Sequence, residues 1–166
     1  IAALRAARDA GVEVPDGALD AAGAYVLRCQ HAREGGFAYQ PGGSASATMT
    51  AAALLCIPQD SPRARAATEY LAGASPKDQP RFPCYAAYYA AHAAGRVGGE
   101  LWTRTWADTV ARLLRTQQRD GGWPASANAQ EPGRVYATAL AVLTLSVPSG
   151  VLPMHQSSMT RRTDRP

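Results

Sequence analysis

Apolar and small residues recur every three or four positions through most of this 166-residue sequence, which is the spacing of one helix face. Alternation of apolar and polar residues with a period of two, the pattern of a half-buried strand, does not persist long enough to predict a sheet. The pattern therefore predicts an all-α fold of seven helices. Their expected ranges are about 1–10, 15–31, 47–57, 62–73, 84–95, 99–117 and 133–147.

Residues that begin or end helices support these ranges. Gly11 follows the first helix, where a residue without a Cβ readily takes the left-handed cap conformation. Pro15 opens the second helix, and Ser61 is expected to cap the fourth, with Pro62 in its first turn. Gly95 is expected to terminate the fifth helix.

One stretch of the sequence occurs twice. LLRTQQRDGGWP at 113–124 is similar to VLRCQHAREGGFAY at 26–39. Residues 36–37 align with 122–123 at a shift of 86, whereas the helix ends before them align at 87, so the first copy has one extra loop residue. The sequence therefore contains a repeat of about 85 residues, made of helix, helix, turn and helix, which divides into helical hairpins of roughly 40 residues.

The helices fall into two classes. The first, third, fifth and seventh are short and rich in alanine, whereas the second, fourth and sixth carry more charged residues. Because small side chains let helices approach closely, we expect the first class to form an inner layer and the second an outer layer.

The repeated stretch is predicted to join one hairpin to the next. Its glycines let the backbone turn without a Cβ penalty, and Trp123 supplies a large apolar surface beside the preceding helix. The glutamines are expected to bond backbone groups at helix ends. The residues of this motif are Gln30, Gly36, Phe37, Gln117, Gln118, Gly122 and Trp123.

Charge and composition exclude some classes of function. Hydrophobic residues make up 46% of the sequence, but no apolar run approaches the roughly 20 residues that cross a bilayer. The formal charge is +4, and the residues from 154 onward contribute half of it. The other arginines are scattered among the helices rather than gathered into one stripe, so the sequence does not predict nucleic-acid binding.

The three cysteines, Cys29, Cys56 and Cys84, are widely spaced and form no C-x-x-C pair. An odd number of cysteines among apolar neighbours predicts buried thiols in a reducing compartment rather than a disulfide framework. We expect a cytoplasmic or membrane-peripheral location.

The motif residues support a family resemblance. LLRTQQRDGGWP looks like the Q-W repeat of squalene and oxidosqualene cyclases, which are related to the β subunits of protein prenyltransferases. The segment from 136 to 156 also resembles the end of bacterial prenyltransferase and squalene-oxidase repeat proteins. The resemblance extends to about Gln156 and implies an α/α toroid. A complete toroid of this family has six hairpins, so this chain is expected to form a partial ring of about three hairpins and one additional inner helix.

The resemblance also implies how the chain is organised. Residues 1–150 are expected to be the toroid segment, and 151–166 a C-terminal tail in which 157–166 is disordered. Because the sequence starts at Ile1, within a helical pattern, we expect it to begin inside a longer protein. The missing half of the ring, or a second copy of this chain, is expected to cover the apolar edge of the arc.

The chemistry of the family needs side chains that this sequence lacks. The cyclases use an Asp-x-Asp-Asp acid, whereas the aspartates here are isolated from one another. Protein prenyltransferases bind zinc through an Asp-x-Cys pair and a later histidine. Cys84 matches the cysteine, but Phe82 stands at the aspartate position and Ala137 at the histidine position. We therefore expect no metal and no cofactor.

Four aromatic residues are the candidate ligand-binding residues. Tyr85, Tyr88, Tyr89 and His92 follow i, i+3, i+4, i+7 spacing and so share one face of the fifth helix. If this face points into the ring, its rings would form the wall of a cavity for an apolar or isoprenoid ligand. The alternative is that these side chains pack against neighbouring helices.

The expected function is to hold an apolar or isoprenoid ligand in the ring, and the resemblance does not extend to the residues of catalysis. Two alternatives stay open. One is a scaffold without catalytic activity whose ring binds a protein partner. The other is a carbohydrate-active toroid similar to polysaccharide lyases, although the sequence lacks a closely spaced pair of carboxylates.

Overall fold

The computed structural model describes residues 1–74, 81–125 and 130–150, and within these ranges the fold is all-helical, as the sequence predicts. Two isolated bridges, Gln30 with Phe37 and Ala38 with Ala45, are the β pairing in this part of the chain. The predicted tail at 151–166, including 157–166, lies outside the described residues. The elements are α1 (Ala2–Asp9), α2 (Ala18–Arg28), α3 (Ala47–Leu54), α4 (Pro62–Gly73), α5 (Pro83–Val97), α6 (Gly99–Thr116), α7 (Arg134–Leu145) and the 3-10 turn η1 (Val147–Ser149).

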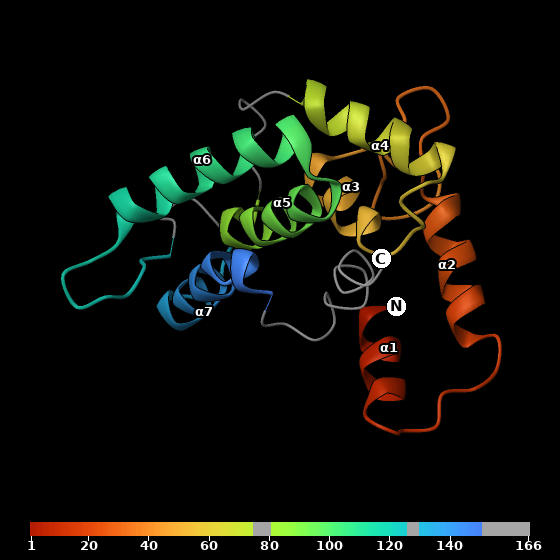
Figure 1. Ribbon diagram of the computed structural model, residues 1–166, viewed down its shortest axis with the longest axis horizontal. Helices are drawn as coiled ribbons and strands as arrows, with labels where there is room; N and C mark the ends of the chain where they lie inside the picture. Colours follow the sequence, from red (N-terminus) through yellow and green to blue (C-terminus); the bar gives the residue numbers. More distant parts are fainter. Residues whose placement is uncertain (75–80, 126–129, 151–166) are drawn as a thin grey trace, which may run out of the picture.

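The helices from α3 to α7 form two layers (Figure 1). The helices α3, α5 and α7 lie side by side with α5 in the middle, α4 packs on α3, and α6 packs on α5. Arg104 of α6 donates a hydrogen bond from Nη2 to the carbonyl oxygen of Ala72 in α4, at 3.1 Å, and so joins the two helices of the other layer. The buried residues of α3, α5 and α7 are mostly alanine and threonine, whose small side chains allow this close packing.

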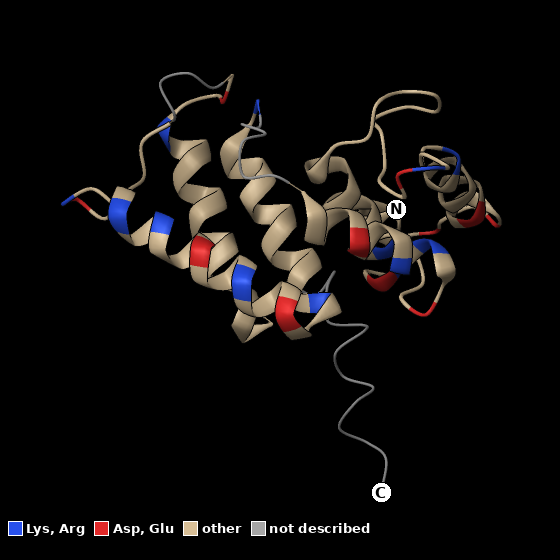
Figure 2. Cartoon of the chain, turned by 90° about the horizontal axis from the view of Figure 1, so that it is seen from above, with Lys and Arg blue, Asp and Glu red and all other residues tan. Residues whose placement is uncertain are grey.

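The charged residues are also distributed unequally between the two layers. Acidic and basic residues mark the length of α6 in Figure 2. By contrast α5 contains the single charged residue Arg96 and α7 the single charged residue Arg134. The layer made by α3, α5 and α7 is therefore the apolar one, and α6 presents a solvated face.

The first hairpin is less tightly packed than the rest. Neither α1 nor α2 contains a buried residue, and α1 contacts mainly α2 (Figure 1). Arg5 connects α1 to the end of α3, because its guanidinium donates to the carbonyl oxygens of Leu55 and Cys56, at 3.3 Å in each case.

Two hydrophobic clusters form the core. Phe37 and Leu54, which are 1% and 0% exposed, belong to the larger cluster among α3, α4 and α5. Trp123 and Leu113, which are 6% and 5% exposed, belong to a second cluster with residues of α7. Each aligned aromatic residue of the repeat, Phe37 and Trp123, is therefore a member of its own cluster.

Some helix ends differ from the sequence prediction. The third helix ends at Leu54 rather than Ile57. The carbonyl groups that follow it bond arginines instead of continuing the helix: Arg96 Nη1 donates to the Leu55 oxygen at 2.6 Å, beside the bond from Arg5. A cation at a helix C-terminus is favourable because it faces the negative end of the helix dipole.

The second and fifth helices also differ from the prediction. The second begins at Ala18, after Gly17 takes a φ of 77°, rather than at Pro15. The fifth continues past Gly95 to Val97 and ends at Gly98, where φ is 77°. A Cβ on Gly95 would lie 3.2 Å from a Val147 methyl, so this glycine allows close packing inside the helix instead of ending it.

The fourth helix begins as the sequence predicts. Ser61 Oγ accepts a hydrogen bond from the Ala64 N–H at 3.1 Å, and Pro62 occupies the first turn.

Candidate ligand-binding cavity

The residues between α6 and α7 form a compact turn, here called the second joint (residues 117–123). Gln117 Nε2 donates to the carbonyl oxygen of Gly121 at 2.9 Å, and the Gln118 N–H donates to that of Gly122 at 2.9 Å. The Trp123 N–H donates to the hydroxyl of Thr138 in α7 at 3.0 Å. The joint therefore connects the end of α6 to the first turns of α7.

The first joint (residues 30–37), between α2 and α3, repeats these bonds at aligned positions. Gln30 Nε2 donates to the Gly35 oxygen at 2.8 Å, and the His31 N–H donates to the Gly36 oxygen at 2.8 Å. The Phe37 N–H donates to the hydroxyl of Thr50 at 2.8 Å. The two sequence copies therefore share these local bonds. Gln30 Nε2 also donates to the carbonyl oxygen of Arg63 in the first turn of α4, at 3.0 Å, so this glutamine bonds a helix end as the sequence predicts.

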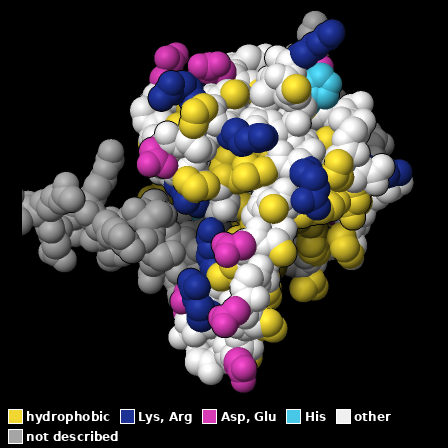
Figure 3. Space-filling view, turned by 90° about the vertical axis from the view of Figure 1, so that its right-hand side faces the viewer, with side chains coloured by type: hydrophobic (Ala, Val, Ile, Leu, Met, Phe, Trp, Pro, Cys, Tyr) yellow, Lys and Arg dark blue, Asp and Glu magenta, His cyan; other side chains and the backbone are white. Residues whose placement is uncertain are grey.

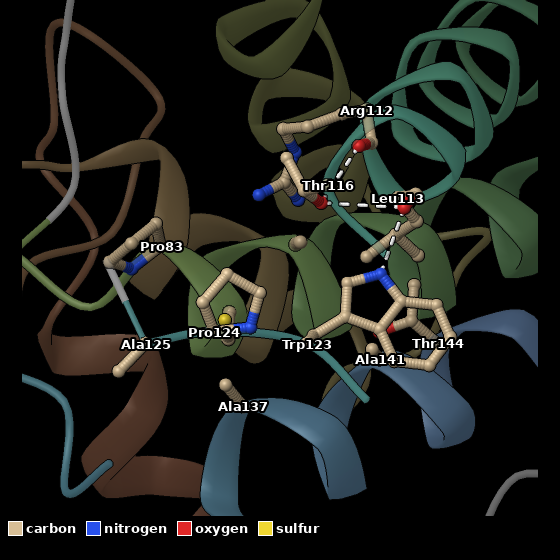
Figure 4. A pocket seen from close by; sticks show the side chains of 12 residues that line it. Pro83, Arg112, Leu113, Thr116, Trp123, Pro124, Ala125, Ala137, Ala141 and Thr144 are labelled. Carbon is tan, nitrogen blue, oxygen red and sulfur yellow. Dashed lines mark hydrogen bonds between the residues drawn. The ribbon is translucent and has the colours of Figure 1, made fainter. Parts of the chain in front are cut away.

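Trp123 adds one bond that phenylalanine cannot make. Its indole Nε1–H donates to the carbonyl oxygen of Leu113 in the last turns of α6, at 2.8 Å, and the bond is buried (Figure 4). The ring is thereby held between α6 and α7.

A cavity of about 250 Å³ lies beside this ring, between α5, α6 and α7 (Figure 4). Most of its wall is apolar, and Trp123 with Pro124 forms the side contributed by the second joint. The residues that line it are Pro83, Cys84, Ala87, Arg112, Leu113, Thr116, Trp123, Pro124, Ala125, Ala137, Ala141 and Thr144.

The polar groups of the cavity differ in how they are bonded. The hydroxyl of Thr116 donates to the Arg112 carbonyl oxygen at 2.9 Å, and that of Thr144 donates to the Leu140 oxygen at 2.7 Å, so both hydroxyls bond their own helices. The Arg112 guanidinium makes no ion pair or hydrogen bond with the residues that the structure describes. It is therefore the charged group that the cavity offers to a ligand.

Cys84, at the start of α5, is paired with Glu131. The Cys84 N–H donates to Glu131 Oε1 at 2.5 Å, which places a carboxylate at the positive end of the helix. Burial raises the pKa of the Cys84 thiol to about 11, and the hydrogen bond to Glu131 and its negative charge act in the same direction, while the charge of Arg112 opposes them. Cys84 is therefore a neutral thiol at physiological pH.

The aromatic residues of α5 pack against one another. The rings of Tyr85 and Tyr89 have centroids 4.6 Å apart, and Tyr88 meets Tyr89 at 5.1 Å and His92 at 4.5 Å. Tyr88 and His92 are 9% and 7% exposed. Burial raises the pKa of Tyr88 and, together with a hydrogen bond to Tyr85, the pKa of Tyr89.

This aromatic face is distinct from the 250 Å³ cavity, because α5 lines the cavity with Pro83, Cys84 and Ala87. None of the four sequence candidates lines it. A ligand-binding role for Tyr85, Tyr88, Tyr89 and His92 stays a prediction.

Two of the three positions that the sequence analysis compared with a zinc motif, Cys84 and Ala137, line the cavity. The third, Phe82, is not among the lining residues. Within the described ranges no group of three or more metal-ligating side chains comes together. The three cysteines are free thiols, with Cys29 buried and the other two partly buried.

Most residues that line this cavity were not sequence candidates, and the charged residues Arg112, in its wall, and Glu131, beside Cys84, are the ones that matter chemically. The sequence gives only a weak indication of Arg112: it stands one helical turn before Thr116, so the two side chains lie on the same face of α6. For Glu131 the sequence gives none, because this residue reaches Cys84 across 47 positions of sequence.

Comparison with models of protein families and with curated proteins finds no significant match for this chain. In the described residues, no helix has the length and apolarity needed to span a bilayer.

Proposed function

We propose that this chain is an arc of an α/α toroid that holds an apolar ligand, an isoprenoid by the resemblance of its repeats, in the cavity between α5, α6 and α7. The observation that carries the proposal is the composition of the cavity wall: aliphatic, proline and tryptophan side chains surround about 250 Å³, with the single cation Arg112 among the lining residues.

The repeat supports the toroid. The first and second joints share three aligned hydrogen bonds, so the hairpins are built as copies of one unit. The alanine-rich helices α3, α5 and α7 follow one another in one layer, with α4 and α6 outside them. Continued addition of such units curves into a closed ring in the family that the sequence resembles.

The size and chemistry of the cavity suit a small apolar ligand. Small-molecule sites usually measure roughly 300–1,000 Å³, so a cavity of about 250 Å³ accepts a short isoprenoid or one end of a longer chain. Removing such a chain from water is favourable by about 25 cal/mol for each Å² of apolar surface. Arg112 is placed to bond the polar end of the ligand.

Binding without turnover is the activity that these residues support. A neutral thiol with a pKa of about 11 is a weak nucleophile, and its partner Glu131 is held at the start of α5. Arg112 remains a cation and does not supply a proton to an alkene.

Farnesol, a neutral isoprenoid alcohol, is a suitable probe for calorimetric titration and native mass spectrometry. We expect it to bind with one molecule per chain. Ala87→Phe, which fills the cavity from α5, is expected to weaken binding by about tenfold or more, equivalent to about 1.4 kcal/mol. The matched control is Ala111→Phe on the exposed side of α6, which should bind farnesol as the wild type does.

Two results would contradict this site. One is the absence of farnesol binding to the wild-type chain, and the other is unchanged affinity in Ala87→Phe. A loss of binding in Tyr88→Ala and Tyr89→Ala, with stability intact and Ala87→Phe unaffected, would move the ligand to the aromatic face of α5.

A further inference from the structure

The repeat does not account for one residue in the wall of the cavity, Arg112. The helix end before the second joint aligns with the helix end before the first joint at a shift of 87 positions, which places Arg112 opposite Tyr25. The first joint forms its bonds with a tyrosine at this position, and Tyr25 is 44% exposed. An arginine at position 112 is therefore not needed to build a joint, and its surroundings in the cavity define what it can bind.

Arg112 is a half-buried cation in a wall that is mostly apolar. Its guanidinium makes no ion pair or hydrogen bond with the residues that the structure describes. None of the described residues that line the cavity is acidic. Because a charge that is partly removed from water is costly unless it is paired, an anion in the cavity would be stabilised at this position.

The other polar side chains of the wall have already used their hydrogen-bond donors. The hydroxyls of Thr116 and Thr144 donate to carbonyl oxygens of their own helices, and the indole N–H of Trp123 donates to the Leu113 oxygen. Arg112 carries five N–H donors and no acceptor. The wall therefore favours a ligand whose polar end only accepts hydrogen bonds.

A carboxylate matches the Arg112 guanidinium in shape and in charge. It accepts two parallel bonds from the planar N–H fork, and such charge-assisted pairs are stronger than hydrogen bonds between neutral groups. Arg112 is the one cation among the described lining residues, so a head group with a single negative charge leaves a neutral pair. A phosphate or diphosphate would bring further charge without a partner, and Glu131, which bonds Cys84 in the same wall, would repel it.

The positions of these side chains suit a ligand with one polar end. In Figure 4 the Arg112 and Thr116 side chains lie next to each other at the α6 side of the cavity. The rings of Trp123 and Pro124 and the methyl groups of α7 form apolar wall beyond them. A head group at Arg112 therefore leaves the remaining space to an apolar chain.

We propose that the ligand of this cavity is an amphiphile with a carboxylate head, which pairs with Arg112, and an apolar chain, which lies against Trp123 and Pro124. This inference rests on the proposed function and adds the chemical class of the head group. The chain can be branched, as in an isoprenoid acid, or linear, as in a fatty acid, since both present the same chemistry to this wall.

Two probes with the same chain test the head group. Farnesoic acid carries a carboxylate where farnesol carries an alcohol, and calorimetric titration at neutral pH, where the acid is ionised, measures both affinities. We expect the wild type to bind farnesoic acid about tenfold or more tightly than farnesol, because hydrogen bonds between charged groups are the stronger ones. Arg112→Gln should lose this preference. Arg112→Lys should keep part of it, since lysine retains the charge without the planar fork.

Arg115→Gln is the matched control. Arg115 lies on the same helix at an exposed position outside the cavity, so this variant removes the same charge and should keep the wild-type ratio of the two affinities. Figure 3, which views the side where α2 and α4 lie, shows basic and acidic side chains interspersed on that face. Equal loss of the preference in Arg112→Gln and Arg115→Gln, with helix content unchanged in circular dichroism, would indicate a general attraction to the cationic chain and would overturn the inference.

The remaining outcomes separate this inference from the proposed function. Equal affinities of the wild type for farnesoic acid and farnesol overturn the inference and leave the apolar cavity standing, whereas binding of neither probe overturns both. Tighter binding of farnesyl diphosphate than of farnesoic acid also overturns the inference, because the head group would then be a polyanion. Decanoate identifies the chain: tighter binding of decanoate than of farnesoic acid assigns a linear chain, the reverse assigns a branched one, and both support a carboxylate head.

Discussion

The indole nitrogen of Trp123 lies 2.8 Å from the carbonyl oxygen of Leu113, and this hydrogen bond ties the second joint to α6. The two residues also line the same cavity, so one contact both fixes the turn between hairpins and shapes the wall of the candidate ligand site. Stability and ligand binding are therefore linked at this position, and substitutions that separate them are informative.

Truncation of Trp123 should be strongly destabilising. Trp123→Ala is expected to cost about 3–5 kcal/mol, because it removes a buried ring from the cluster of Leu113, Ala137 and Ala141. Trp123→Phe keeps most of the packing and loses the indole hydrogen bond, so we expect a cost near 1 kcal/mol. The Leu113 oxygen then still accepts the Gln117 N–H at 3.0 Å. Urea denaturation, followed by circular dichroism, measures the unfolding free energy of both variants. Normal stability of Trp123→Ala, with altered ligand binding alone, would contradict a structural role.

Thr50 and Thr138 accept hydrogen bonds from the backbone N–H groups of the two joints, and we expect their substitution to destabilise the protein by different amounts. Thr50→Val leaves the buried Phe37 N–H without its acceptor, so we expect a cost of about 1–3 kcal/mol. Thr138→Val should cost less, since the Trp123 N–H is only partly buried. Thr103→Val, at an exposed position of α6, is the control and should be nearly neutral. Equal losses of thermal stability in all three variants would contradict a structural role for the hydrogen bonds from the joint N–H groups to Thr50 and Thr138.

The aligned glycines of the two joints should tolerate alanine differently. Gly36→Ala places a methyl group 2.8 Å from the Tyr70 ring, which is fixed between α4 and the joint. Such overpacking typically costs about 1–3 kcal/mol. Gly122→Ala meets the end of the Arg134 side chain, which moves aside, so its cost should be smaller. Denaturation midpoints of the two variants compare them directly, and a larger loss in Gly122→Ala would be the contrary result.

The ionisation of Cys84 should be visible in its reactivity. With a folded pKa of about 11 against an ordinary value of 9.0, its alkylation by iodoacetamide should increase most steeply near pH 11. Glu131→Gln removes the negative charge, so the pKa of Cys84 should fall, while burial keeps it above 9.0. Peptide mass spectrometry identifies the modified cysteine. A half-maximal rate at pH 9 in the wild type would mean that Cys84 is not buried beside Glu131.

The same shift predicts a direction for stability. A pKa that is raised on folding favours the folded state below the unfolded value, and this contribution is lost as the pH rises through the folded value. The contribution of Cys84 should therefore be complete below pH 9 and decline toward pH 11. Cys84→Ala should show a flatter dependence of the unfolding free energy on pH over this window.

The sequence by itself determined the helices, the repeat and most of the local capping. Apolar spacing is a property of neighbouring residues, so the all-α fold could be predicted, and Ser61 and Pro62 begin α4 as expected. The recurrence of the joint was also visible, since Gly36 and Phe37 stand at the same places as Gly122 and Trp123.

Only the tertiary structure decided where helices stop and which distant groups meet. Gly95 lies inside its helix with Val147 packed against it, and α3 ends at Leu54, directly before the Leu55 carbonyl group to which Arg5 and Arg96 donate. The cavity likewise depends on the packing of three helices, and the pairing of Cys84 with Glu131 joins residues 47 positions apart. Such contacts depend on how helices pack in space, and local sequence patterns carry no record of that packing.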